Sequence, residues 1–156
     1  MYCFIFNQLG NVHRLSGDLE KSYEYLTKAI AVKLKIYQKD NIYMYQSFQN
    51  IGTYFRETGN CRKALSIFQI WRRSFKKNAD STNIEFGHLY NNLSNAYSEC
   101  NILDSALIYA EKSKTVFLAN VGMDNYLTGS SMLTLGNALV KSGKINEASF
   151  NMKKQT

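Results

Sequence analysis

The sequence predicts an all-α solenoid, and three observations support this fold class. The chain contains four similar copies at a spacing of 42 residues, apolar residues recur in each copy at helical spacing, and proline is absent from all 156 residues. Apolar residues three or four apart lie on one face of a helix, and helices without proline can be long. Repeated helical units bury their apolar faces only by stacking on their neighbours.

Four columns of equivalent residues define the repeat. They are an apolar column (Leu9, Ile51, Leu93 and Leu135), a small column (Gly10, Gly52, Ser94 and Gly136), a turn column (Gly17, Gly59, Asn101 and Gly143) and a second small column (Ser22, Ala64, Ala106 and Ala148). The small columns predict positions where two helices approach closely, because a bulky side chain there would force the helices apart.

Each repeat reads as two amphipathic helices. In the first repeat Phe6, Leu9 and His13 share one face of a first helix; Gly17 ends this helix, and Asp18 is the expected N-cap of the second. An apolar stripe follows on the second helix, at Leu19, Tyr23, Leu26 and Ile30. The later first helices repeat the pattern with Phe48, Ile51 and Phe55, with Tyr90, Leu93 and Tyr97, and with Met132, Leu135 and Leu139.

These elements predict eight helices, no strand and one repeat domain over residues 1–156, with repeats at about 3–40, 43–82, 85–122 and 127–156. The fourth repeat is short and no polar helix follows it, whereas solenoids usually carry such a cap. We therefore expect a fragment of a longer array. Its last apolar face, with Leu135, Leu139 and Ala148, is expected to be exposed or covered by another chain, which would allow self-association through the C-terminal end.

The repeat resembles the tetratricopeptide repeat, whose pattern is an aromatic residue, Leu-Gly and Tyr, followed by Ala-x-x-x-Phe. The second repeat reads Phe48-x-x-Ile51-Gly52-x-x-Phe55 with Ala64-x-x-x-Phe68, and the likeness covers essentially the whole chain. A unit of 42 residues without a final proline is similar to those of the kinesin light chain and of bacterial repeat proteins attached to signalling or protease domains. HEAT and armadillo repeats have similar periods but lack this spacing. The resemblance implies a right-handed stack of about four antiparallel helix pairs.

The resemblance also implies that the first helices line a concave groove that binds a peptide. The side chains expected there are Asn7, Asn11, Arg14, Gln49, Asn50, Thr53, Arg56, His88, Asn91, Asn92, Asn95, Thr134 and Asn137, together with Lys141. Asparagine carries a donor and an acceptor, so this amide-rich face could pair with the backbone of an extended peptide. The alternative is a solvated surface without a ligand. Arg14 and Arg56 favour an acidic peptide, with Glu57 and Glu99 as balancing charges.

Motifs for catalysis, metal binding and cofactor binding are missing from the sequence. His13 and His88 belong to different repeats and lack the spacing of metal ligands, and there is no Walker loop, G-x-S-x-G or G-x-G-x-x-G. We therefore expect no enzyme activity, no metal and no cofactor.

The formal net charge of +7 makes nucleic acid a possible partner. Many basic residues, however, fall where second helices should end, at Lys33, Lys35, Lys39, Arg72, Arg73, Lys76, Lys77, Lys112 and Lys114. Cations in a last turn complement the helix dipole. We interpret them as a solvated surface, which favours a protein over nucleic acid as the partner.

The chain has no apolar run near the roughly 20 residues that span a bilayer, and its first residues do not resemble a signal peptide. We expect a cytoplasmic protein that does not contact a membrane. The first interpretation is a protein–protein interaction module that binds an extended peptide or a partner protein. The alternative is a peptide- or partner-sensing segment of a larger bacterial regulatory protein, and the third is a basic scaffold that contacts nucleic acid.

Overall fold

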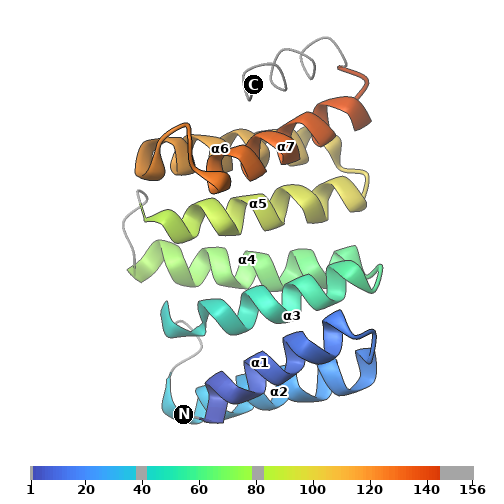
Figure 1. Cartoon of the computed structure of the whole chain (residues 1–156), viewed down its shortest axis with the longest axis vertical. Helices are drawn as coiled ribbons and strands as arrows, with labels where there is room; N and C mark the ends of the chain where they lie inside the picture. Colours follow the sequence, from blue (N-terminus) through green and yellow to red (C-terminus); the bar gives the residue numbers. More distant parts are fainter. Residues whose placement is uncertain (1, 38–41, 79–82, 145–156) are drawn as a thin grey trace. The chain divides into compact units, whose positions relative to one another are not determined.

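The computed structural model describes residues 2–37, 42–78 and 83–144, and every regular element in these ranges is helical (Figure 1). The elements are α1 (Tyr2–Leu15), α2 (Leu19–Ile36), η1 (Ile42–Met44), α3 (Tyr45–Glu57), α4 (Cys61–Asn78), α5 (Ile84–Glu99), α6 (Leu103–Val121) and α7 (Tyr126–Lys141). The all-α prediction is confirmed. The expected eighth helix, with Ala148, lies outside the described residues.

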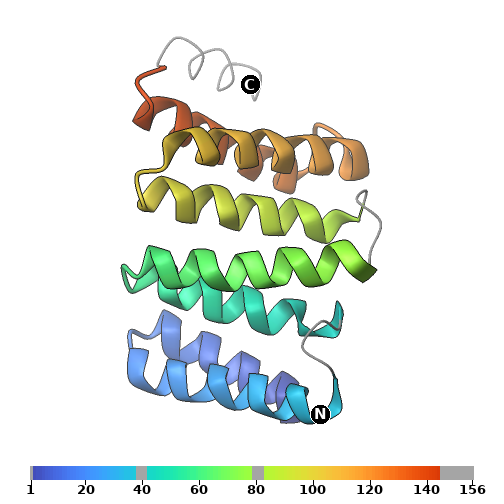
Figure 2. The ribbon, with the colours of Figure 1, turned by 180° about the vertical axis from the view of Figure 1, so that it is seen from behind.

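The chain divides into two compact units, an N-terminal unit of residues 1–79 and a C-terminal unit of residues 80–156. In the N-terminal unit α1 lies beside α2 and α3 beside α4, as both views show (Figures 1 and 2). In the C-terminal unit α5 pairs with α6, and α7 packs on both. The division falls between the second and third repeats, so the boundary of the units follows the boundary of the repeats.

The turn column is built by one recurring motif. Gly17, Gly59, Asn101 and Gly143 all have positive φ, between 60° and 82°, a conformation that glycine and asparagine tolerate best. The residue after each turn donates its backbone N–H to the carbonyl five residues earlier, as Asp18 does to His13 and Ile102 does to Tyr97. This is the Schellman arrangement that ends a helix. The predicted cap is also confirmed, because the Asp18 side chain accepts from the Lys21 N–H at 3.1 Å.

The small columns mark close helix contacts, as predicted. A Cβ atom added to Gly52 would lie 2.3 Å from the Phe68 ring of α4, far inside normal contact. In the third repeat the Ser94 hydroxyl takes this place and donates to the Ala106 carbonyl at 2.9 Å. Ser22, Ala64 and Ala106 are fully buried. The paired helices can therefore approach this closely only because these side chains are small.

The α2 stripe differs from the sequence prediction. Leu26 is buried, but Leu19 and Tyr23 are 42% and 44% exposed. The face that α2 buries instead carries Ser22, Leu26, Ala29 and Lys33. This face meets α1 at Gly10, where an added Cβ atom would lie 2.7 Å from the Leu26 side chain.

Lys33 was predicted to be part of a solvated helix end, but it is buried. Its side chain is only 7% exposed, and its Nζ donates to the backbone carbonyl of Tyr43 at 2.8 Å. Burial lowers the pKa of this amine. Lys33 thus ties the end of α2 to the segment that leads into α3.

The prediction of an exposed last apolar face is also wrong in part. Leu135 and Leu139 were expected on an exposed end face, but they are buried against Ala110 and Leu107 of α6. The first-helix face that carries the apolar column therefore packs on the preceding helix pair. Ala148 lies outside the described residues.

Candidate functional site

In the N-terminal unit, the predicted site residue Asn7 is an interior residue. Its side chain is fully buried, and its Nδ2 donates to the Ser47 hydroxyl at 3.2 Å. This bond joins α1 to α3, so the amide is used inside the unit. Its placement corrects the prediction of a groove-lining side chain.

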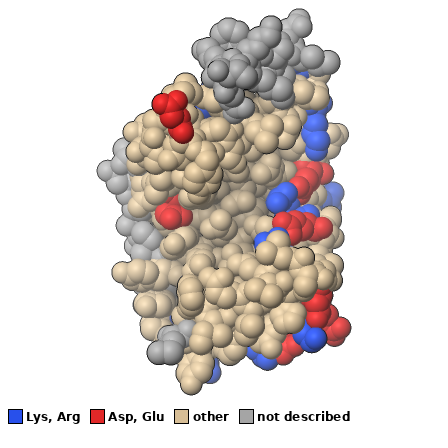
Figure 3. Space-filling view, viewed as in Figure 1, with Lys and Arg blue, Asp and Glu red and all other residues tan. Residues whose placement is uncertain are grey.

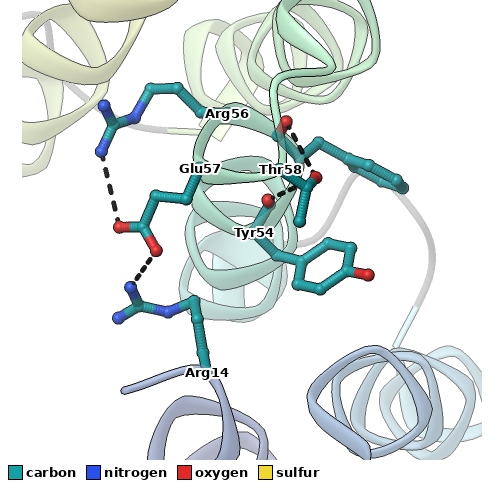
Figure 4. Close-up of polar contacts among 6 residues, drawn as sticks. Arg14, Tyr54, Arg56, Glu57 and Thr58 are labelled. Atoms are coloured by element: carbon teal, nitrogen blue, oxygen red, sulfur yellow. Dashed lines mark hydrogen bonds and ion pairs between the residues drawn. The ribbon is translucent and has the colours of Figure 1, made fainter. Parts of the chain in front are cut away.

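A cluster of three charged side chains lies where α1 and α3 end (Figure 4). Arg14 reaches from α1 to Glu57 with 2.5 Å between Nη1 and Oε2, and Arg56 Nη2 lies 3.7 Å from Oε1 of the same carboxylate. The side chains are 16%, 23% and 38% exposed for Arg14, Arg56 and Glu57. We call this group the Arg14–Glu57–Arg56 cluster.

Two guanidinium groups flank one carboxylate in this cluster. The Arg14 Nε is buried and has no hydrogen-bond partner among the described residues. Guanidinium groups present several donors in a fixed plane that suits carboxylates. The cluster therefore has the chemistry of carboxylate recognition, and Glu57 shows how a carboxylate can lie between the two arginines.

The remaining predicted residues of this unit are half-buried. Asn11, Gln49, Asn50 and Thr53 all keep part of their surface open to solvent. The Asn50 Nδ2 is a buried donor with no partner within residues 2–37, 42–78 and 83–144. These side chains place amide and hydroxyl groups on the two helices, α1 and α3, that carry the charged cluster.

In the C-terminal unit, α5 and α7 bring Asn95 and Asn137 together. Both line one pocket of about 310 Å³ with Ser98, Glu99, Val140 and Lys141. Asn137 is exposed and Asn95 half-buried. Ser98 and Val140 were not among the residues predicted from the sequence, although each follows its asparagine by three residues and so lies on the same face of the helix.

Two other predicted residues of this unit are involved in the fold. His88 packs against the Phe117 ring with centroids 5.0 Å apart, and burial lowers the pKa of its imidazole. Thr134 is 8% exposed and donates its hydroxyl to the Ser130 carbonyl at 3.2 Å. Thr134 therefore contributes little to any surface, which corrects its prediction as a site residue.

Asn91 and Asn92 are both half-buried on α5. The Asn91 Oδ1 is a buried acceptor that lacks a partner in the part of the chain that the structure describes. A buried amide oxygen without a hydrogen bond is costly, and a bound donor would remove that cost.

A second pocket in the C-terminal unit was not predicted from the sequence. It has a volume of about 680 Å³ and is lined by Met123, Asp124, Asn125, Tyr126, Gly129, Ser130, Met132 and Leu133. Large side chains are exposed along it, with Tyr126 at 79% and Leu133 at 53%. None of the polar columns of the first helices predicts this pocket. Of its lining residues, Leu133 does belong to the repeat column of Asn91.

Charged side chains of both signs are mixed on the surface. Figure 3 shows Lys and Arg side chains among Asp and Glu side chains on the face that it views. Several described lysines lie against acidic neighbours, as Lys28 does against Glu24 and Lys114 against Glu111. These pairs neutralise part of the positive charge locally.

No described residues form a group of three or more side chains that could hold a metal ion. Among the described helices, none combines the length and apolar character that a membrane crossing requires.

Part of the chain matches a known repeat family. Residues 2–69 match the model of the tetratricopeptide repeat family. No curated protein sequence matches the chain.

Solved structures similar to this chain are also repeat proteins. BtubC (BKLC) from P. vanneervenii has a TM-score of 0.85 at 15% identity, over 98% of this chain and 61% of that one. The nearly identical TPR-like repeats of a kinesin light chain candidate from Podosopora anserina have a TM-score of 0.87 at 15% identity, over 96% of this chain and 71% of that one. A single-residue variant of those repeats gives the same values. The chain thus spans less than two thirds of BtubC, and the likeness shows the fold, an all-α helical repeat solenoid.

Proposed function

Because residues 2–69 match the tetratricopeptide repeat family, we propose that this protein is an interaction module that binds an extended segment of a partner protein. Repeats of this family generally mediate protein–protein interactions and are typically non-catalytic scaffolds. The proposed binding residues lie on the first helices of the repeats, α1 and α3 in the N-terminal unit and α5 and α7 in the C-terminal unit. A fold does not specify a ligand, so the side chains on these helices must support the proposal.

The observation that carries the proposal is the pocket shared by Asn95 and Asn137. Each amide offers a donor and an acceptor, and an extended peptide presents the matching N–H and C=O groups along its backbone. Such bonds contribute about 0.5–1.5 kcal/mol each after loss of water. Two asparagines from different helices can therefore hold a peptide backbone without requiring a particular side chain.

The Arg14–Glu57–Arg56 cluster supports a preference for acidic segments. Its two guanidinium groups lie on the first helices of the N-terminal unit, three residues after Asn11 and Thr53 in the helical sequence. An acidic side chain of a partner could bind these guanidinium groups as Glu57 does. The formal net charge of +7 favours the same partners through long-range attraction.

The binding residues that we propose are Asn11, Arg14, Gln49, Asn50, Thr53 and Arg56 in the N-terminal unit, and His88, Asn91, Asn92, Asn95 and Asn137 in the C-terminal unit. Asn7 and Thr134 are left out because their side chains are buried. The absence of catalysis by this chain and its cytoplasmic location are parts of the same proposal, and cell fractionation tests the second.

The test starts from a displayed library of random peptides, from which binders of the full chain are selected. A selected peptide is then titrated by fluorescence anisotropy against the parent, the Asn95→Ala/Asn137→Ala variant and an Asn120→Ala control. We expect the double variant to bind about tenfold or more weakly, since two backbone hydrogen bonds are lost. Asn120 is an exposed amide of α6, so its replacement should leave the affinity unchanged.

Stability measurements separate binding residues from structural ones. The double variant should melt like the parent, whereas Asn7→Ala should lose about 1–3 kcal/mol, because it leaves the buried Ser47 hydroxyl without its hydrogen bond. If instead the Asn95→Ala/Asn137→Ala variant loses stability and keeps its affinity, these amides are structural and the proposal fails. The nucleic-acid scaffold would be favoured by a different result. In that case the chain would also bind single-stranded DNA, the double variant would weaken peptide and DNA binding equally, and binding would disappear at high salt.

A further inference from the structure

Most of the net positive charge of the chain lies on one helix. The sequence of α4 contains six basic residues and no acidic residue. The whole chain has 19 basic and 12 acidic residues and a formal net charge of +7. With the six basic residues of α4 set aside, the other residues have a net charge of only +1. The excess of positive charge is therefore a property of α4 and not of the whole surface.

The outer face of α4 presents part of this charge as a single row. Arg62, Arg73 and Lys76 are exposed, and their spacings of eleven and three residues place them on one side of the helix. Arg62 and Arg73 lie roughly 16 Å apart along the helix axis. The opposite side of α4 is buried and carries Ala64, Phe68, Trp71 and Phe75. We call Arg62, Arg73 and Lys76 the α4 row; α4 lies in front of α3 in Figure 2.

The cations of the α4 row lack the acidic neighbours that α2 provides for its own lysines. Lys21 lies 3.1 Å from Asp18, and Lys28 pairs with Glu24 one turn before it. Within the described residues, by contrast, no cation of the α4 row forms an ion pair. The charge of the row is thus available to a group from outside the chain.

Compensation of the helix dipole does not explain the row. Cations stabilise the last turn of a helix and destabilise the first turn. Arg62 lies in the first turn of α4, where no acidic residue is present. Like charges three or four residues apart also repel each other, as Arg73 and Lys76 do. The row therefore lowers the stability of α4, and a bound anionic group would remove this cost.

We propose that the α4 row binds an acidic segment of a partner protein, whose carboxylates are spaced along one side of that segment. Guanidinium and ammonium groups pair with carboxylates, and arginine does so through two parallel hydrogen bonds. The row belongs to a second helix, whereas the peptide-binding residues proposed above lie on first helices. This surface is therefore a further one, and it does not depend on the proposed peptide site.

The shape of the row favours an acidic segment over nucleic acid. The row is one side chain wide, and α2, the other second helix of the N-terminal unit, exposes the acidic residues Glu20 and Glu24. A duplex carries phosphates on both sides of a groove about 12 Å wide, so it requires a broader basic surface. Unpaired bases stack on exposed aromatic rings, but the rings of α4, at Phe68, Trp71 and Phe75, are buried.

Fluorescence anisotropy of a labelled oligoglutamate peptide, titrated with the full chain at physiological ionic strength, tests the proposal. Exposed charges are screened beyond about 8 Å under this condition, so cations close to the peptide dominate. The variant Arg62→Gln/Arg73→Gln/Lys76→Gln should bind about tenfold more weakly, because three exposed charge pairs are lost. Its melting temperature should be no lower than that of the parent, since the substituted side chains are exposed and like charges are removed.

The matched control is Lys21→Gln/Lys28→Gln/Lys35→Gln, which removes the same number of exposed charges from α2. It should change the affinity less than twofold. An equal loss of affinity in both triple variants would assign the binding to net charge and overturn the proposal.

Two further results would also overturn it. One is oligoglutamate binding that the α4 variant leaves unchanged, or that Arg14→Ser/Arg56→Val abolishes, since either would place the peptide elsewhere. The other is a DNA duplex that the parent binds more tightly than oligoglutamate and that the α4 variant no longer binds, which would make nucleic acid the ligand of the row.

Discussion

The N-terminal unit carries Arg14 and Arg56 at the repeat position where the C-terminal unit carries Ser98 and Val140. In the first case two guanidinium groups flank Glu57; in the second the same position borders a pocket lined by Asn95 and Asn137. The helix contacts beneath these faces are alike, with Gly52 against Phe68 in one unit and Ser94 against Ala106 in the other. One framework therefore supports two different surface chemistries.

The helix contacts are alike and the surfaces differ because the two kinds of position have different steric limits. The small columns are restricted by a neighbouring helix a few ångströms away, so only Gly, Ala or Ser fits. Arg14, Arg56, Ser98 and Val140 keep part of their surface open to solvent, so side chains of different size and charge can occupy this repeat position. The helix framework and the ligand preference can thus vary independently, and substitutions can change one without the other.

The largest predicted effect is a loss of stability, which should be similar in the two units. Gly52→Ala would place a Cβ 2.3 Å from the Phe68 ring, and Ala106→Leu would force a branched side chain into a fully buried helix contact. Each should lower the free energy of unfolding by about 1–3 kcal/mol, as overpacking does. Urea unfolding followed by circular dichroism measures this loss.

The matched control is Ala119→Leu, which replaces alanine by leucine at an exposed position of α6 and should leave stability within about 0.5 kcal/mol of the parent. If Gly52→Ala or Ala106→Leu unfolds together with this control, the two units do not share a close-packed framework at these columns.

A smaller effect is expected when the surface chemistry is transferred. Ser98→Arg/Val140→Arg gives the C-terminal unit the two arginines of the N-terminal unit. We expect an oligoglutamate peptide to bind several-fold more tightly at low ionic strength, with most of the gain lost near 1 M salt, where exposed charges are screened within about 3 Å. Isothermal titration calorimetry at two salt concentrations measures both affinities.

The reciprocal variant Arg14→Ser/Arg56→Val should weaken binding of the same peptide. An affinity that is unchanged by either exchange would show that the guanidinium groups serve only to hold Glu57, and the contrast between the two faces would then have no role in recognition.

The smallest effect concerns pH and only the C-terminal unit. Burial lowers the pKa of His88, whereas its equivalents Phe4 and Gln46 in the N-terminal unit do not titrate. With an unfolded pKa near 6.5, the unfolded state binds a proton more readily than the folded one. The free energy of unfolding should therefore fall as the pH is lowered from about 7 to about 5.

Replacement by His88→Gln should remove this fall, as measured by thermal unfolding at a series of pH values. Glu85 lies one turn earlier on α5 and acts in the opposite sense, because burial raises the pKa of its carboxyl group and so favours the protonated folded state. The fall should remain, or increase, in Glu85→Gln. A pH profile that His88→Gln leaves unaltered would assign the dependence to other groups.

The repeat and its helices were predictable because they depend on local spacing. Gly17 and Asn101 end helices through their own backbone conformation, and Asp18 caps α2 through a neighbour three residues away. The small columns were predictable for the same reason, since they recur at a fixed period. Asn95 and Asn137 could be named because they belong to one column of that period.

The sequence-based predictions were wrong where a residue contacts a partner that is distant in the sequence. Asn7 and Asn11 look alike in the sequence, yet Asn7 is buried against Ser47, forty residues away. Lys33 resembled a solvated helix end, but the chain returns at Tyr43 and covers it. The face that α2 buries, with Ser22, Leu26, Ala29 and Lys33, likewise differs from the stripe that the sequence predicted.

Sequence alone was therefore sufficient for the period, the helix ends and the positions where helices meet, because each of these follows from residues within one or two turns of each other. The packing of the helices then selected which polar side chains are free to act. It buried Asn7, paired Arg14 with Glu57 across two repeats and placed Asn95 beside Asn137. The physical reason is that burial and charge pairing depend on helix rotation and on neighbours about forty residues away, and local periodicity does not encode either.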